Sequence, residues 1–152
     1  GPPGQGPSLH RKACDIAAIA QAAEAVGMME ALIRMVVDYT SARKQFGKPL
    51  AEFQVLQHRM ADMVLNLEDT RSLVYMAALG EPDGPNRDSE IAGMKVHANE
   101  ALRFVSQQAV QLHGGMGITD DLWVGHFFKR AMVLMAAHGG TPHYRARYEA
   151  SL

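Results

Sequence analysis

The chain has 152 residues, of which 47% are hydrophobic and 20% charged, a balance typical of one globular domain and not of a disordered chain. Its formal net charge of −1 does not support a nucleic-acid partner, which would require a basic surface. The single cysteine, Cys14, excludes an internal disulfide. The sequence shows neither a signal-peptide pattern nor an apolar run near the ~20 residues of a membrane span. We therefore expect a cytoplasmic protein with no membrane contact.

The first eight residues differ in composition from the rest of the chain. They begin with GPPGQGP, which does not suit a helix interior, so we expect residues 1–8 to be a disordered tail or linker. Ser8 is a suitable N-cap for a long helix over residues 9–42. Small and apolar residues recur along that helix at helical spacing, which favours close packing on more than one side: Ile16, Ile19, Ala20, Ala23, Gly27, Ala31 and Met35.

Two further long helices follow, each after a segment rich in glycine and proline. The second is expected over residues 51–79, after a loop at residues 45–49. The third is expected to begin with Asp88 or Ser89 as its cap and to end at Gly114, where glycine can adopt a left-handed conformation.

The last part of the chain predicts a fourth helix over residues 121–137 and a short helix that begins near Pro142. No segment alternates convincingly with the period of a strand. The sequence therefore predicts an all-α fold over residues 9–152, an up-down four-helix bundle with a short extra C-terminal helix.

The first candidate site follows the first helix, where Arg43, Gln45 and Phe46 lie close together and Gln54 follows shortly after. An arginine at a helix C-terminus complements the helix dipole, and the local stretch alone favours this structural interpretation. The planar fork of arginine also suits a diphosphate, and a phenylalanine suits the face of a planar ring.

The second candidate site is the segment from Gln111 to Gly117, which has three glycines in four residues at the expected end of a helix. Such a turn can expose backbone N–H groups to a phosphate or a cofactor edge. A tight turn between two helices explains the same glycines, so the segment alone does not establish a ligand site.

Together the two segments resemble the C-terminal domain of the acyl-CoA dehydrogenases. They read SARKQFGKPLAEFQ from Ser41 to Gln54 and AVQLHGGMGITDD from Ala109 to Asp121, and the resemblance extends from Leu9 to Leu152. It implies a helical bundle, an oligomer that completes each FAD site, and acyl-CoA bound at the complex. The residues matching FAD-contacting positions of the family are Arg43, Gln45, Phe46, Gln54, Gln111, Leu112, His113, Gly114 and Gly115.

The same resemblance indicates that the catalytic carboxylate is missing. The family removes the acyl α-proton with a Glu after the fourth helix, and that position corresponds here to His138, or to Gly139 with one inserted residue. Some members use a Glu of the first helix instead, where this chain has Ala17. A CoA-contacting Asp of the family matches Asp15, but the Arg expected three residues later is Ala18.

Three functions remain open at this point. The chain is most similar to the base-lacking subunit type of heteromeric acyl-CoA dehydrogenases, which would complete an FAD site for a partner and not act alone. The first alternative is a self-sufficient dehydrogenase fragment that uses His138 as base. The second alternative is a helical interaction module without flavin.

Two smaller features complete the sequence-based expectations. The segment VGHFFKR, which contains His126, Lys129 and Arg130, resembles two-chain acyl-CoA dehydrogenases, some of which act on sterol side chains or dicarboxylic acyl groups, but a solvated basic face explains it equally well. The seven histidines show no pattern that predicts a metal site.

Overall fold

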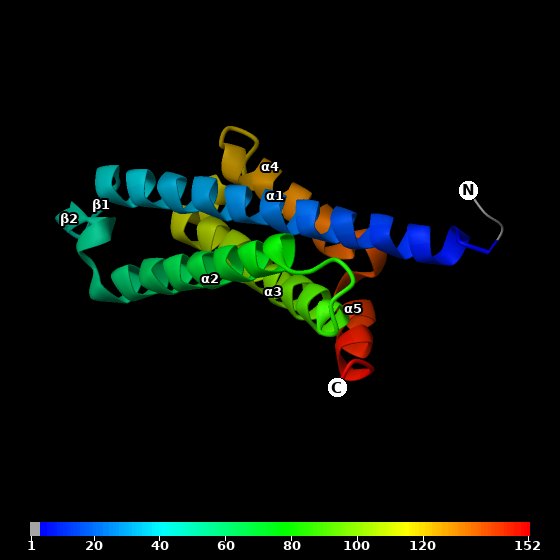
Figure 1. Cartoon of the computed structure of the whole chain (residues 1–152). Helices are drawn as coiled ribbons and strands as arrows, with labels where there is room; N and C mark the ends of the chain where they lie inside the picture. Colours follow the sequence, from blue (N-terminus) through cyan, green and yellow to red (C-terminus); the bar gives the residue numbers. More distant parts are fainter. Residues whose placement is uncertain (1–3) are drawn as a thin grey trace.

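Four long helices and a short fifth one form an up-down bundle in the computed structural model, which describes residues 4–152 (Figure 1). The helices are α1 (Gly6–Ala42), α2 (Gln54–Leu79), α3 (Arg87–His113), α4 (Trp123–Ala136) and α5 (Gly140–Glu149). Short 3₁₀ turns cover Leu50–Glu52, Gly114–Ile118 and Ala137–Gly139. The strands β1 (Lys44–Gln45) and β2 (Lys48–Pro49) form a small antiparallel hairpin. The predicted all-α bundle is confirmed.

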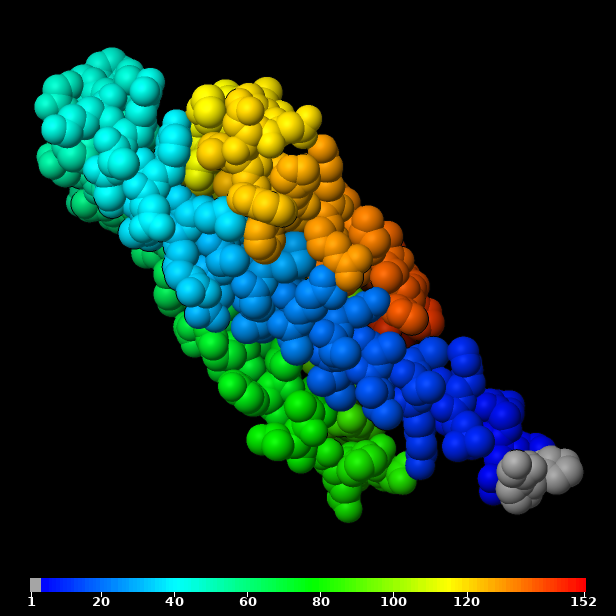
Figure 2. All heavy atoms as spheres, turned by 90° about the horizontal axis from the view of Figure 1, so that it is seen from above, coloured from blue at the N-terminus to red at the C-terminus, as the bar shows by residue number. Residues whose placement is uncertain are grey.

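Helix α3 is the centre of the bundle, because it packs against each of the other four helices. Figure 2 shows α1, blue to cyan, along the length of an elongated molecule, with α2 on one side and α4 and α5 on the other. The hairpin and the 3₁₀ turn after α3 lie at the same end of this molecule. The antiparallel course of the helices therefore brings two segments together that are more than sixty residues apart in sequence.

Small side chains allow the helices to approach closely, but not all at the predicted positions of α1, because Ile16, Ala20, Ala23 and Gly27 are exposed. Ala18, Ala22 and Ala25 follow one another along one face of α1, and all three are buried. The first two belong to a cluster with Ile91, Met94 and Tyr144, whereas Ala25 belongs to a larger one with Met29, Leu32, Leu102 and Val105. The buried face of α1 therefore contributes to both parts of the core.

Helix α1 is long and apolar enough to cross a membrane by length and composition alone, with a mean hydropathy of 1.5 over 18 residues. The sequence-based statement that no run approaches a membrane span is wrong by this criterion. A core helix meets the same criterion. In the bundle, α1 contacts α2, α3 and α4, and 33% of the apolar window is buried there.

Several helix ends differ from the sequence-based expectation. Helix α1 begins at Gly6 instead of Leu9. Pro7 is compatible with the first turn, because the N–H groups there have no partner within the helix and the N–H that proline lacks is not missed. Ser8 does not cap this helix, and its hydroxyl donates to the carbonyl of Gln5. The predicted tail is thus helical from residue 6 on, while residues 1–3 lie outside the described residues. Helix α3 begins at Arg87, so Asp88 lies in the first turn and does not cap it.

Candidate functional site

A groove at one end of the bundle contains residues from both sequence segments that matched the family. Its volume is about 600 Å³, and it lies between the end of α1, the hairpin, the start of α2 and the end of α3. Its lining consists of Tyr39, Arg43, Gln45, Leu50, Val55, Leu56, Arg59, Gln111, Leu112, His113, Gly114, Gly115 and Met116. The structure therefore combines the two candidate segments into one site.

The hairpin positions one side of this groove. Lys44 pairs with Pro49 and Gln45 with Lys48, and the two residues at the tip, Phe46 and Gly47, have φ values of 52° and 83°. Positive φ at both tip residues is typical of the tight turn that matches the twist of two strands. Two strands of two residues are too short to show alternation, which explains why the sequence did not predict them.

Phe46 and Gln54 do not line the groove. The Phe46 side chain is 91% exposed and makes an edge contact with the Phe53 ring, the centroids being 6.3 Å apart. Gln54 is the first residue of α2 and is exposed. Both remain predicted cofactor contacts, and each is next in sequence to a residue that lines the groove, Gln45 and Val55 respectively.

The groove carries two guanidinium groups and no acid. Arg43 forms no ion pair with any residue in the described range 4–152. Arg59 donates a hydrogen bond from Nη1 to Oε1 of Gln108 at 3.0 Å. None of the lining residues is Asp or Glu. This arrangement favours a bound anion, because no carboxylate in the lining competes for the arginines.

The glycine turn after α3 forms the other side of the groove. Helix α3 ends before Gly114, so the predicted glycine stop is confirmed, but its φ of 59° and ψ of −140° are not the expected left-handed helical conformation; only glycine adopts them readily. The N–H of Gly114 donates to the carbonyl of Gln111, so this donor is not available to a ligand as the sequence had suggested. A Cβ atom added at Gly114 or Gly115 would meet nothing within 4 Å, so both glycines border open space.

Gly117 has a different role in the same turn. A Cβ atom at this position would lie 2.6 Å from the carbonyl oxygen of Val110, closer than real contacts allow. The turn therefore folds back onto α3 only because residue 117 lacks a side chain.

His113 joins the turn to α1 and α3. It is buried, and its Nδ1 lies 2.8 Å from the carbonyl oxygen of Ala109, while its ring packs on Tyr39 with centroids 4.5 Å apart. Because a carbonyl only accepts, Nδ1 of His113 carries a proton and donates it to this hydrogen bond. Tyr39 is four residues before Arg43, so helical spacing was an available sequence signal for its place in the groove.

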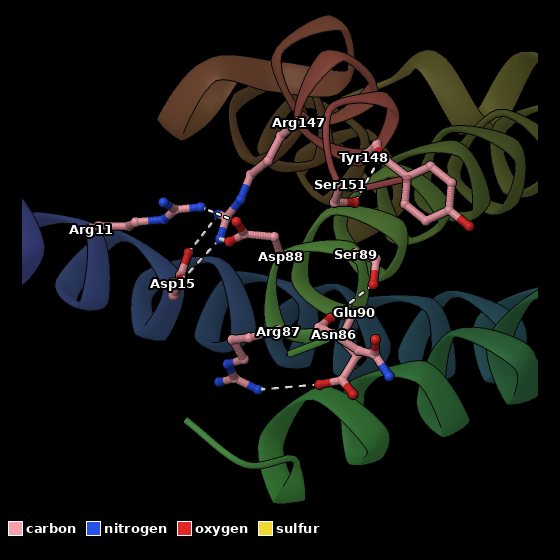
Figure 3. A network of polar contacts seen from close by, with 10 residues as sticks. All are labelled: Arg11, Asp15, Asn86, Arg87, Asp88, Ser89, Glu90, Arg147, Tyr148 and Ser151. Atoms are coloured by element: carbon pink, nitrogen blue, oxygen red, sulfur yellow. Dashed lines mark hydrogen bonds and ion pairs between the residues drawn. The ribbon is translucent and has the colours of Figure 1, made fainter. Parts of the chain in front are cut away.

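Asp15 lies at the opposite end of the bundle and is held by the chain itself. Nη1 and Nη2 of Arg147 donate to its two carboxylate oxygens at 2.6 and 3.2 Å, and Nη2 also donates to Asp88 at 2.7 Å (Figure 3). Arg11 binds the other oxygen of Asp88. The hydrogen bond from Arg147 is the main cause of the lowered pKa of Asp88. The predicted CoA contact of Asp15 stays untested, and the observed contact of its carboxylate is an ion pair between α1 and α5.

The junction of α4 and α5 holds the predicted base position. His138 is exposed and has φ 56°, and Gly139 and Gly140 follow with φ values of 108° and 62°. Ala17, the other base position of the family, is half-buried, and Ala18 is fully buried. None of these positions carries a carboxylate.

Two buried polar residues of α3, which the sequence reasoning missed, hold the end of α4. Lys95 donates from Nζ to the carbonyl of Leu134 at 3.3 Å, and Asn99 donates to Met135 and to the Thr141 hydroxyl at 3.4 and 3.2 Å. These contacts satisfy carbonyls that a helix end leaves without partners. Burial lowers the pKa of Lys95 from 10.5 to about 8. Lys95 and Asn99 are four residues apart on an otherwise apolar face of α3, and this helical spacing is the sequence signal that could have identified them.

The basic segment of α4 is engaged in surface contacts. Arg130 donates to both oxygens of Glu24 at 2.7 and 2.9 Å, and Lys129 lies 3.4 Å from Asp120. The ring of His126 lies 5.4 Å from that of Trp123. These contacts favour the interpretation as a solvated face. Among residues 4–152 no group of His, Cys, Asp and Glu forms a metal site.

Comparisons with known proteins agree with this geometry. The family model for "Acyl-CoA dehydrogenase, C-terminal domain" matches residues 4–146. Acryloyl-CoA reductase (NADH) of Anaerotignum propionicum is 37% identical over 133 residues, which cover 88% of this chain and 34% of the relative. Human short-chain specific acyl-CoA dehydrogenase is 33% identical over 133 residues, 88% of this chain and 32% of the relative.

Solved structures show the same fold. Butyryl-CoA dehydrogenase from Megasphaera elsdenii superposes with a TM-score of 0.93 and 30% identity over 99% of this chain and 39% of that chain. The ChsE4-ChsE5 complex from Mycobacterium tuberculosis superposes with a TM-score of 0.84 and 27% identity over 90% and 37%. The chain thus spans about a third of the length of the relatives it matches. Because the family model covers nearly all of it, the chain belongs to the acyl-CoA dehydrogenase family of flavoprotein oxidoreductases, as its C-terminal helical domain.

Proposed function

We propose that this chain completes the FAD site of an acyl-CoA dehydrogenase, which desaturates an acyl-CoA thioester between its α and β carbons. The observation that carries this proposal is the groove that joins Arg43 and Gln45 to the turn from Gln111 to Gly115. When bound, FAD supplies the hydride acceptor of such a reaction.

The residues of the groove fit the diphosphate part of FAD. Arg43 presents a guanidinium without a carboxylate partner in the described chain, and Gly114 and Gly115 leave open space beside it. A planar fork that donates two hydrogen bonds matches a phosphate group. Gln45 and Gln111 add amide groups able to donate or accept, and Leu112 and Met116 add apolar contact area.

A second chain or domain would supply the catalytic base. The base positions carry His138, Gly139 and Ala17. Two acids of α1, Asp15 and Glu24, already bind Arg147 and Arg130. The hydrogen bond from Arg130 lowers the pKa of Glu24, and both carboxylate oxygens of Asp15 are engaged by Arg147, so neither suits proton abstraction from an acyl α-carbon. The likeness to the ChsE4-ChsE5 complex supports a heteromeric assembly. The cytoplasmic location stays a prediction.

The test is the absorbance of the chain purified alone and together with a neighbouring dehydrogenase-like gene product. We expect the oxidised-flavin band near about 450 nm in the co-purified complex and little of it in the chain alone. Arg43→Met should reduce the flavin content of the complex, whereas Arg103→Met, which removes an exposed arginine outside the groove lining, should not. A complex that assembles without flavin would contradict the proposal and favour a helical interaction module.

The position of His138 supports a second candidate, a fragment that is catalytic with an imidazole base. The side chain is exposed at the junction of α4 and α5, so a neutral ring could accept a proton there. In this case His138→Gln would abolish turnover in a flavin-loaded preparation that contains no second acyl-CoA dehydrogenase-like chain. If the partner holds the base, the same variant should keep most of the activity of the complex.

A further inference from the structure

Arg59 is a second arginine of the groove that the sequence segments did not identify. It lies near the start of α2 and lines the same groove as Arg43, which follows α1. Its Nη1 donates to Gln108 on α3 at 3.0 Å, so one of its five N–H donors is engaged. The remaining donors are available to a ligand.

The pairing of the other arginines distinguishes Arg59 from residues that link helices. Seven of the ten arginines bind an Asp or Glu within residues 4–152, namely Arg11, Arg34, Arg71, Arg87, Arg130, Arg145 and Arg147. The three without such a partner in that range are Arg43, Arg59 and Arg103, and the first two line the groove. Arginine charge without a carboxylate is thus concentrated where an anion is expected.

We propose that Arg59, oriented by the amide of Gln108, is a second phosphate-binding residue of this groove and binds the diphosphate of the dinucleotide together with Arg43. The inference rests on the proposed function. A diphosphate diester carries two negative charges, and two guanidinium groups, one after the end of α1 and one in α2, match both its charge and its two phosphate groups. The neutral amide oxygen of Gln108 accepts a hydrogen bond from Arg59, which fixes the direction of the arginine side chain without neutralising the charge of the guanidinium.

The experiment titrates ADP into the full chain and follows the backbone amide signals of Gly114 and Gly115 by NMR. ADP carries the diphosphate and adenosine moieties without the flavin, and adenosine alone serves as the phosphate-free probe. We expect Arg59→Met to raise the Kd for ADP about tenfold and Gln108→Leu to raise it about threefold, with no change for adenosine. Arg103→Met removes the same charge outside the groove and should leave the Kd for ADP unchanged.

The outcomes separate this inference from the proposed function. If ADP shifts both glycine signals equally well in wild type and in Arg59→Met, Arg59 does not bind phosphate, although the groove does. If ADP at millimolar concentration leaves both signals of the wild-type chain unchanged, the groove does not bind a diphosphate and this inference fails, whereas the proposed function is decided separately by the flavin content of the co-purified complex. Should Arg59→Met lose its helical circular dichroism, Arg59→Lys makes the same comparison, and we expect a smaller loss of affinity because the charge remains.

Discussion

Lys95 is a buried amine at the centre of the bundle, and replacing it with Met tests how the burial of charge affects stability. The side chain is 2% exposed, and its only hydrogen bond within residues 4–152 is to the carbonyl of Leu134. Burial disfavours the charged form and lowers the pKa of Lys95 to about 8. The unfolded chain, with a pKa of 10.5, therefore binds more protons between these two values.

This difference fixes the sign and the size of the effect. Because the unfolded state binds more protons, the free energy of unfolding rises with pH above about 8. At about 1.4 kcal/mol per pKa unit, the gain between about pH 7 and about pH 9.5 is about 2 kcal/mol. Burial raises the pKa of Tyr144, so the titration of this residue lowers the free energy of unfolding as pH rises above its ordinary pKa of 10.0. The higher of the two pH values is therefore kept below 10.0.

The assay is urea unfolding, followed by circular dichroism at both pH values. Wild type should gain about 2 kcal/mol at the higher pH, and Lys95→Met should lose this gain. Lys129→Met, which removes an exposed amine, should keep it. An equal pH response in wild type and Lys95→Met would show that the amine of Lys95 is hydrated in the folded protein, and the reasoning would be wrong.

Three further predictions concern single contacts. Gly117→Ala should destabilise the chain by about 1–3 kcal/mol in urea unfolding, because the added Cβ would collide with the Val110 carbonyl. Gly27→Ala, where the added Cβ meets nothing within 4 Å, should stabilise the chain by about 0.5–1 kcal/mol. Equal effects of the two variants would refute the close approach at Gly117. Arg147→Met should cost about 3–5 kcal/mol of stability in thermal or urea unfolding, because it leaves the buried carboxylate of Asp15 unpaired. If this pair is the cause, adding Asp15→Leu to Arg147→Met should restore part of the lost stability. The lowered pKa of Asp88 contributes stability at pH values above 3.8, its ordinary pKa, and this stability is lost as pH falls through the lower pKa of the folded state. The stability of Asp88→Asn should therefore decline less steeply than that of wild type in acid titrations followed by circular dichroism.

Local patterns predicted the fold correctly because helices depend on nearby residues. Helical spacing and the glycine and proline breaks located all five helices, although α1, α3 and α5 begin earlier than expected and α2 and α4 begin later. The hairpin was missed because four strand residues carry no periodic signal. The glycine stop at Gly114 was predicted correctly, but the use of its N–H inside the turn was not, because hydrogen bonds of a turn depend on its dihedral angles.

The sequence by itself determined the helical bundle and the family resemblance, since residue type and spacing carry this information directly, and it predicts that the base positions carry no carboxylate. The tertiary structure alone decided which charges meet. Asp15 and Arg147 are 132 residues apart, and their contact depends on how α1 and α5 pack. The same packing brings Arg43 and Arg59 to the turn at Gly114 and buries Lys95. Such contacts depend on the arrangement of whole helices, which spacing along one helix does not encode.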